Sequence, residues 1–144
     1  MWKELVSRFA NEHQFRTPAS PTEIGAAARV VGCELPSELR GVLEESNGLY
    51  GPYGSGLIWS TEMMAEQNAL MRSTSDFREL YMPFDCLLFF GDAGNGDLFA
   101  YTILAGSVRR SDVFAWNHEN DSRMWVAPNL SRYLEWWLTG RMKL

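Results

Sequence analysis

The segment 91–97 reads Gly-Asp-Ala-Gly-Asn-Gly-Asp, a composition that can cradle a phosphate or bind calcium. Dinucleotide loops and P-loops place their glycines in a different order, and a P-loop also needs a lysine that is missing here. A calcium loop beginning at Asp92 needs oxygen ligands at its third and fifth positions and a glutamate at its twelfth. Those positions hold Gly94, Gly96 and Ile103. We therefore expect a tight turn between two strands, with a loop that contacts a partner as the alternative.

The segment 117–121, Asn-His-Glu-Asn-Asp, is the second place where potential metal ligands gather. A metalloprotease helix needs a second histidine four residues after the first, but Ser122 stands at that position. The other histidine of the chain is His13, far away in the sequence. The segment is expected to be a polar strand end. A contact surface, or a metal or acid–base site built around His118 and Asp121, remains as an alternative.

Nucleophilic chemistry finds little support in the sequence. The two cysteines, Cys33 and Cys86, are too few for a disulfide framework or a four-cysteine zinc site. Neither has the basic neighbours that favour a reactive thiolate. Residues 54–56 read Gly-Ser-Gly and lack the spacing of a nucleophile elbow. We therefore expect a protein that is not an enzyme and that needs no metal or cofactor.

The first half of the chain is expected to form mainly helices. Ser20, Pro21 and Glu23 are typical of a helix start with a capping box, and Gly32 of a helix end. A third helix is expected to open at 35–36 and to end at 47–48, and Ser60 or Thr61 can cap a fourth. The apolar stripes that predict the four helices are Trp2, Leu5, Val6 and Phe9; Ile24, Ala27, Ala28 and Val31; Leu39, Val42 and Leu43; and Met63, Met64, Gln67, Leu70 and Met71.

Short apolar runs rich in aromatic and β-branched residues predict strands in the second half of the chain. We expect strands at 57–59, 87–90, 98–104 and 113–118, the middle two forming a hairpin. The glycine-rich segment 48–56 is expected to be a loop. A last helix carries Leu130, Tyr133, Leu134, Trp137 and Leu138 and is closed by Gly140. This order predicts one α+β domain over residues 1–144, with N-terminal helices and a C-terminal helix packed on a mainly antiparallel sheet.

The charge of the chain limits its possible partners. The 144 residues carry a net charge of −5, which does not suit a protein that grips phosphate backbones. Residues 85–121 hold two arginines against six acidic residues, so this block is the most densely negative. It is either an ordinary solvated surface or a docking face for a basic partner. No stretch is typical of a signal peptide or a membrane span, so we expect a cytoplasmic protein with no membrane or nucleic-acid partner.

Aromatic residues are the other excess in the composition, with six tryptophans. The apolar patterns around them place Trp2, Trp116, Trp125 and Trp137 in the core. Trp136 lies about 100° around the helix from its neighbour, so both cannot occupy the centre of one stripe. Tyr50 and Tyr53 fall in the glycine-rich loop. These last three are candidate interface anchors, with partial burial against the domain itself as the alternative.

Part of this pattern resembles a known family. The proline-led helix that ends in Asn47-Gly48, with Leu39 and Leu43 on its apolar face, resembles the helical signature of the SUKH superfamily, the Smi/Knr cell-wall-assembly regulator type. The likeness covers about residues 20–140, and Ala28 stands where many members carry a glutamate. Its further matching positions are Ile24, Val31-Gly32, Leu35-Pro36, Phe90-Gly91, the turn to Asp97, Leu130 and Leu134.

The resemblance implies a single α+β domain without enzymatic activity. Bacterial members are commonly immunity proteins that bind and neutralise a secreted toxin, often a nuclease, and fungal members regulate cell-wall synthesis. The resemblance therefore implies an immunity protein whose partner is a toxin, such as a basic nuclease domain, with a regulatory adaptor as the alternative. The residues expected to contact the partner are Tyr50, Tyr53, Asp92, Asn95, Asp97, Glu119, Asp121 and Trp136.

Overall fold

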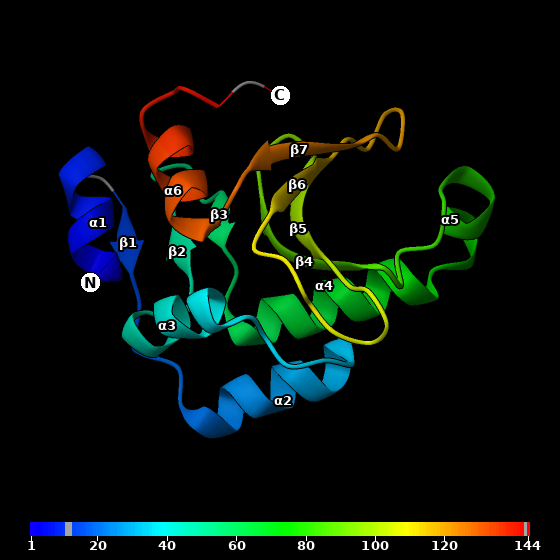
Figure 1. Cartoon of the computed structure of the whole chain (residues 1–144), viewed down its shortest axis with the longest axis horizontal. Coiled ribbons are helices and arrows are strands. Elements are labelled where there is room, and N and C mark those ends of the chain that lie inside the picture. Colours follow the sequence, from blue (N-terminus) through cyan, green and yellow to red (C-terminus); the bar gives the residue numbers. More distant parts are fainter. Residues whose placement is uncertain (11–12, 143) are drawn as a thin grey trace.

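The computed structural model describes residues 1–10, 13–142 and 144 and consists of helices and two antiparallel sheets (Figure 1). The six helices of the described residues are α1 (Trp2–Phe9), α2 (Pro21–Val31), α3 (Ser37–Glu45), α4 (Thr61–Ser73), α5 (Ser75–Leu80) and α6 (Leu130–Leu138). The strands of the described residues are β1 (Gln14–Phe15), β2 (Leu49–Tyr50), β3 (Gly56–Ile58), β4 (Leu87–Asp92), β5 (Leu98–Thr102), β6 (Val113–Trp116) and β7 (Arg123–Ala127). The architecture is α+β, as the sequence predicts.

The strands form two sheets that follow chain order. The first sheet has the order β1-β2-β3 and the second the order β4-β5-β6-β7, with every neighbouring pair antiparallel. The predicted hairpin between the strands at 87–90 and 98–104 is confirmed as β4–β5. The backbone N–H of Trp59 donates to the carbonyl of Phe90 at 2.7 Å and ties the end of β3 to β4. The two sheets therefore lie against each other through β3 and β4.

This junction requires a glycine. A Cβ on Gly91 would collide with the backbone carbonyl of Leu57. From the other side, the hydroxyl of the fully buried Tyr133 in α6 donates to the same carbonyl at 2.8 Å. Burial makes such a hydrogen bond necessary, because an unpaired polar group inside a protein is costly. The closing helix is thereby fixed over the junction of the sheets.

Layers of helices cover one face of the second sheet. In Figure 1, α4 runs below the strands and α2 packs on the far side of α4. Asn68 of α4 is fully buried, and its amide donates to the carbonyl of Phe89 at 2.8 Å and accepts from the N–H of Phe89 at 2.9 Å. These two hydrogen bonds fix the position of α4 along β4.

Local sequence signals explain where two of the helices begin and end. Ser20 and Glu23 form the predicted capping box around Pro21, and Gly32 ends α2 in a left-handed conformation. Helix α1 has no side-chain cap of its own. The carboxylate of Glu45, at the end of α3, accepts from the backbone N–H groups that open α1 and so caps it from another element.

The structure departs from the sequence predictions at several elements. The segment 48–56 is not entirely a loop, because Leu49 and Tyr50 pair as β2 with both β1 and β3. The sequence patterns did not predict β1, β7 or α5. Trp125 on β7 was expected in the core but is 48% exposed. It lies on the edge strand of the second sheet, where its indole N–H donates to Asp112 at 2.8 Å.

Candidate functional site

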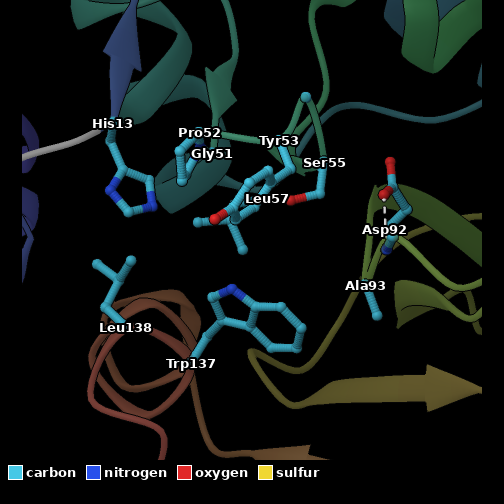
Figure 2. A pocket seen from close by; sticks show the side chains of 12 residues that line it. His13, Gly51, Pro52, Tyr53, Ser55, Leu57, Asp92, Ala93, Trp137 and Leu138 are labelled. Carbon is cyan, nitrogen blue, oxygen red and sulfur yellow. Dashed lines mark hydrogen bonds between the residues drawn. The ribbon is translucent and has the colours of Figure 1, made fainter.

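An open cleft of about 660 Å³ lies where four parts of the molecule meet (Figure 2). The β2–β3 loop at 51–55 forms one wall, and the end of α6, with Trp137 and Leu138, forms the opposite wall. Asp92 and the start of the β4–β5 turn close one end, and His13 lies at the other end. Its volume falls in the range of small-ligand and side-chain binding pockets.

The β2–β3 loop is a small closed turn that projects Tyr53. The N–H of Gly51 donates to the carbonyl of Ser55 at 2.9 Å, and the N–H of Gly54 donates to the carbonyl of Gly51 at 3.0 Å. At the tip of this turn, Tyr53 is 98% exposed. An aromatic ring held in water on an ordered loop is typical of an interface anchor. The predicted anchor role of Tyr53 is compatible with this placement and stays a prediction.

Asp92 lies at one end of the cleft, and its carboxylate accepts three hydrogen bonds, all from uncharged donors. One carboxylate oxygen, Oδ2, accepts from the indole N–H of Trp59 at 2.7 Å and from the backbone N–H of Gly56 at 3.3 Å. The other, Oδ1, accepts from the backbone N–H of Gly94 at 3.0 Å. The carboxylate is therefore fixed in position while it still lines the cleft.

The negative charge of Asp92 has no cationic partner within the described residues. The five ion pairs found there all involve other carboxylates. The charge of Asp92 also acts on the buried Tyr133. Burial raises the pKa of the Tyr133 hydroxyl, and the charge of Asp92 raises this pKa further. The cleft thus carries an uncompensated negative charge at one end.

Trp137 supplies the second aromatic wall. Its ring packs edge-on against Phe99 with ring centroids 5.6 Å apart, and its remaining surface faces the cleft. The sequence pattern assigned this residue to the core, and the structure places it half-buried. The signal that could have revealed its role is the adjacent Trp136, because two neighbouring tryptophans cannot both point to the centre of one helix face.

The β4–β5 turn holds two of the predicted contact residues, Asn95 and Asp97, and their environments differ. Asn95 is exposed, and its side chain accepts from the N–H of Asp97 at 3.0 Å. Asp97 is only 7% exposed. Its carboxylate pairs with Nδ1 of His118 at 2.7 Å and accepts from the backbone N–H of His118 at 3.2 Å. In this structure the carboxylate of Asp97 joins two turns and presents little surface to a partner, in contrast to the expectation of a polar contact.

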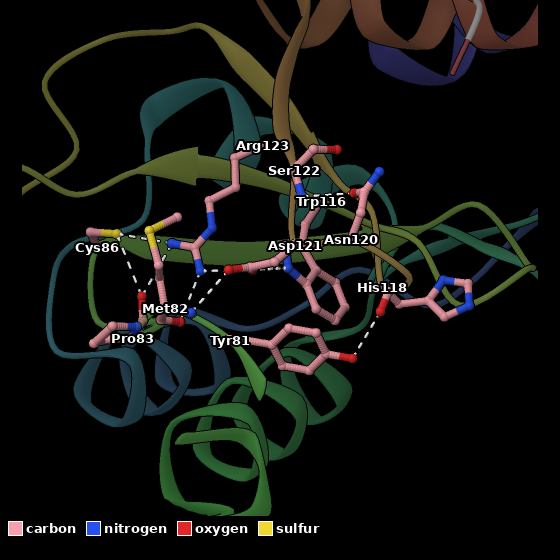
Figure 3. Close-up of polar contacts among 10 residues, drawn as sticks. All are labelled: Tyr81, Met82, Pro83, Cys86, Trp116, His118, Asn120, Asp121, Ser122 and Arg123. Atoms are coloured by element: carbon pink, nitrogen blue, oxygen red, sulfur yellow. Dashed lines mark hydrogen bonds and ion pairs between the residues drawn. The ribbon is translucent and has the colours of Figure 1, made fainter. Parts of the chain in front are cut away.

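Asp121 also belongs to an internal network, drawn in Figure 3. It accepts from the indole N–H of Trp116 at 2.7 Å, from the backbone N–H of Met82 at 2.9 Å and from Arg123 at 3.1 Å. The side chains of Asp121 and Arg123 are both only 14% exposed. Arg123 donates in turn to the carbonyls of Met82 and Pro83. This network clamps residues 81–83 onto the β6–β7 turn, so Asp121 has a structural role here.

The electrostatics of this network follow from its donors. Partial burial by itself would raise the pKa of Asp121, but the hydrogen bonds from Met82, Trp116 and Arg123 outweigh it. They hold the pKa below its ordinary value of 3.8. Asp121 is also one of two non-glycine residues of the described chain with a positive φ, at 61°. The network therefore offsets the cost of an unfavourable backbone conformation.

The alternative of a metal or acid–base site requires His118 and Asp121 to face each other, and Figure 3 shows that they do not. The imidazole of His118 points away from Asp121, which faces Arg123. No group of three or more metal-binding side chains comes together among the residues that the structure describes. Of the remaining residues of this turn, Glu119 is exposed and available for contact.

The other two candidate anchors, Tyr50 and Trp136, lie outside the cleft. The ring of each is covered by an arginine of the same chain. The guanidinium of Arg16 lies 4.2 Å from the ring centre of Tyr50, whose hydroxyl accepts from the N–H of Ser60. The guanidinium of Arg141 lies 5.0 Å from the ring centre of Trp136. Of the eight predicted contact residues, the cleft brings together Tyr53 and Asp92.

The aromatic pair of Trp125 and Trp136 was not predicted as a pair. Their ring centroids are 6.3 Å apart, so Trp125 of the edge strand β7 packs against Trp136 of α6. None of the described helices combines the length and apolar character that crossing a bilayer requires.

Comparison with known proteins identifies the family. The family described as SMI1-KNR4 cell-wall, SUKH_6, matches residues 21–134, from the start of α2 into α6. A comparison with curated proteins found no match. Members of this superfamily often act as protein–protein binding modules. Because the match spans well over half of the sequence and the architecture is α+β, the chain belongs to the SUKH_6 family of the SUKH (SMI1-KNR4) superfamily.

Proposed function

We propose that this chain is a cytoplasmic immunity protein that binds a secreted bacterial toxin and neutralises it by protein–protein contact, without catalysing a reaction itself. The observation that carries the proposal is membership of a family whose members often bind other proteins. The cleft supports it, since it is lined both by an exposed aromatic residue, Tyr53, and by a carboxylate without a cationic partner among the described residues, Asp92.

The toxin is proposed to carry a basic surface, as a nuclease domain does. The block 85–121 has two arginines against six acidic residues, and Asp92, Glu119 and Asn95 present polar groups to solvent there. Charge of this kind mainly accelerates association and selects the partner. Asp97 and Asp121 are left out of this surface because their carboxylates are engaged inside the chain.

A regulatory adaptor without a toxin is the second candidate, and the family description favours it by naming the cell wall. Gene neighbourhood distinguishes the two functions, because an immunity gene lies beside the gene of its toxin.

The test is protection from that neighbouring toxin. Cells that express the toxin domain alone should stop growing, and cells that also express this chain should grow. A Tyr53→Glu variant that folds normally should protect less well than the wild-type chain, and an Asp76→Asn variant should protect fully. Growth arrest despite abundant wild-type protein would reject immunity and leave the adaptor as the better assignment.

A further inference from the structure

We infer that the cleft between the β2–β3 loop and α6 receives an arginine side chain of the partner protein. The inference rests on the proposed function, since it assumes that a protein partner exists. It names the group that the partner inserts and the residues that recognise it: the rings of Tyr53 and Trp137 and the carboxylate of Asp92 (Figure 2).

The charge of Asp92 is not compensated by a cation of the described residues. Asp92 is held by three uncharged donors and forms no ion pair among the described residues. A carboxylate offers about four lone-pair sites, so three donors leave about one free. A cationic N–H that enters the cleft can occupy that site, and a charged donor makes a stronger hydrogen bond than a neutral one.

The rings of Tyr53 and Trp137 differ from two other aromatic rings of the chain in what covers them. Elsewhere this chain covers half-buried rings with its own cations: Arg16 lies over Tyr50, and Arg141 over Trp136. Within the described ranges, no lysine or arginine lies over Tyr53 or Trp137. Both rings line the cleft, and a cation within about 6 Å of such a ring is attracted by its negative face.

The combination favours arginine over lysine. A guanidinium is planar and weakly hydrated, so it can stack on an aromatic ring while one of its N–H groups donates to a carboxylate. The ammonium of lysine is a compact, strongly hydrated charge that fits flat aromatic walls less well. The cleft, about 660 Å³ and open, has room for the whole side chain and the backbone that carries it.

The test uses the full-length chain labelled with ¹⁵N and titrated with N-acetyl-L-arginine amide. Signals of the Trp137 indole N–H and of the amides of Gly51, Gly54 and Gly94 should shift. The same concentration of N-acetyl-L-citrulline amide, which is similar in shape and uncharged, should cause a several-fold smaller shift. N-acetyl-L-glutamate amide should cause none at these positions.

Two variants make the test specific. Tyr53→Ala and Asp92→Asn should each weaken arginine binding by about threefold to tenfold. Tyr53→Phe should bind like the wild-type chain because the ring is kept. Tyr53 is 98% exposed, so its removal cannot be confused with unfolding. Asp76→Asn on α5, an exposed carboxylate at the far end of the molecule in Figure 1, is the matched control and should change nothing.

Three outcomes would overturn the inference: equal shifts with citrulline, stronger binding of the glutamate probe, or unchanged binding in both Tyr53→Ala and Asp92→Asn. The protection assay separates this result from the proposed function. A toxin that is bound equally well by Asp92→Asn and Tyr53→Ala rejects the arginine site and leaves immunity standing. Specific arginine binding by a chain that protects against no neighbouring toxin supports the site and counts against immunity.

Discussion

The β6–β7 turn and the Asp92 end of the cleft both belong to the acidic segment 85–121, yet their carboxylates have different partners. At the β6–β7 turn, Asp121 is paired with Arg123 and bound by an indole and a backbone N–H. In the cleft, Asp92 is also bound by an indole and backbone N–H groups, but no cation of the described chain joins it. Similar hydrogen bonds therefore surround a carboxylate that has a cationic partner in one place and a carboxylate that has none among the described residues in the other.

The carboxylates of an acidic surface do not all contribute equally to the attraction of a partner. The net charge of a segment counts both carboxylates equally, but a partner is attracted only by charge that the protein has not already compensated. Asp97 and Asp121 stabilise the turns, while Asp92 and Glu119 remain available. A charge-reversal experiment aimed at the partner surface should therefore avoid the first two residues, because their loss would change the structure of both turns.

The largest expected effect comes from breaking the compensated site. Asp121→Ala removes the ionic partner of Arg123, whose side chain is 14% exposed. It also leaves the indole N–H of Trp116 without its acceptor. We expect a loss of about 2–4 kcal/mol in the free energy of unfolding. Urea unfolding at neutral pH measures it, and Glu119→Ala on the same turn should stay within about 0.5 kcal/mol. Equal effects of the two variants would mean that the network contributes nothing.

The next prediction tests the contact between the two turns. Gly96 has a φ of 102°, and a Cβ there would lie 2.9 Å from the ring of His118. Gly96→Ala should therefore cost about 2 kcal/mol through backbone strain and displacement of the imidazole from Asp97. Gly106→Ala, with a φ of 80° and nothing within 4 Å, isolates the strain and should cost about 1 kcal/mol. A smaller loss for Gly96→Ala than for Gly106→Ala in urea unfolding would contradict the contact.

A third prediction concerns pH. The pKa of Asp121 is lowered in the folded chain from its ordinary value of 3.8. Its charge therefore stabilises the fold fully above about pH 4, and this contribution is lost as the pH falls through the lower, folded pKa. The stability difference between the wild-type chain and Asp121→Asn should be largest at pH 7 and should shrink by pH 3. Urea unfolding at several pH values checks this, and a difference that grows on acidification would be the wrong sign.

The smallest expected effect comes from the cleft itself. Tyr53→Ala removes a ring that is 98% exposed, so the free energy of unfolding should change by less than about 0.5 kcal/mol. Tyr81→Phe is the matched comparison, because it removes a hydroxyl that donates to the carbonyl of His118 at 2.8 Å and should cost about 1 kcal/mol. If Tyr53→Ala is the more destabilising of the two, the β2–β3 loop is part of the core and not a free contact surface.

Much of the fold was predictable because its signals are local. The capping box of Ser20 and Glu23, the stop at Gly32 and the hairpin at 87–104 follow from residues that are neighbours in the chain. Strands β1 and β2 were missed because two-residue strands carry no periodicity of their own. Trp125 was misplaced for a related reason: whether a strand lies at the edge of a sheet depends on its partners and not on its own residues.

The candidate site was predictable only in part. Tyr53 and Asp92 were identified by residue type and by their glycine-rich surroundings, but Trp137 was assigned to the core. The sequence did not separate Asp92 from Asp121. Arg123 stands only two residues after Asp121, but this spacing alone does not show that the two side chains pair. Other donors to the two carboxylates, Trp59 for the first and Met82 for the second, lie 33 and 39 residues away.

The family, the α+β class and the negative charge of the region 85–121 follow from the amino-acid sequence alone, as does the position of most helices and strands. These properties depend on composition and on short-range patterns of apolar, capping and turn residues. The three-dimensional arrangement was needed to establish which carboxylates are compensated, which aromatic rings stay open and where they meet to form a cleft. Hydrogen bonds, ion pairs and burial act between atoms that are close in space, and the fold brings those atoms together from distant parts of the chain.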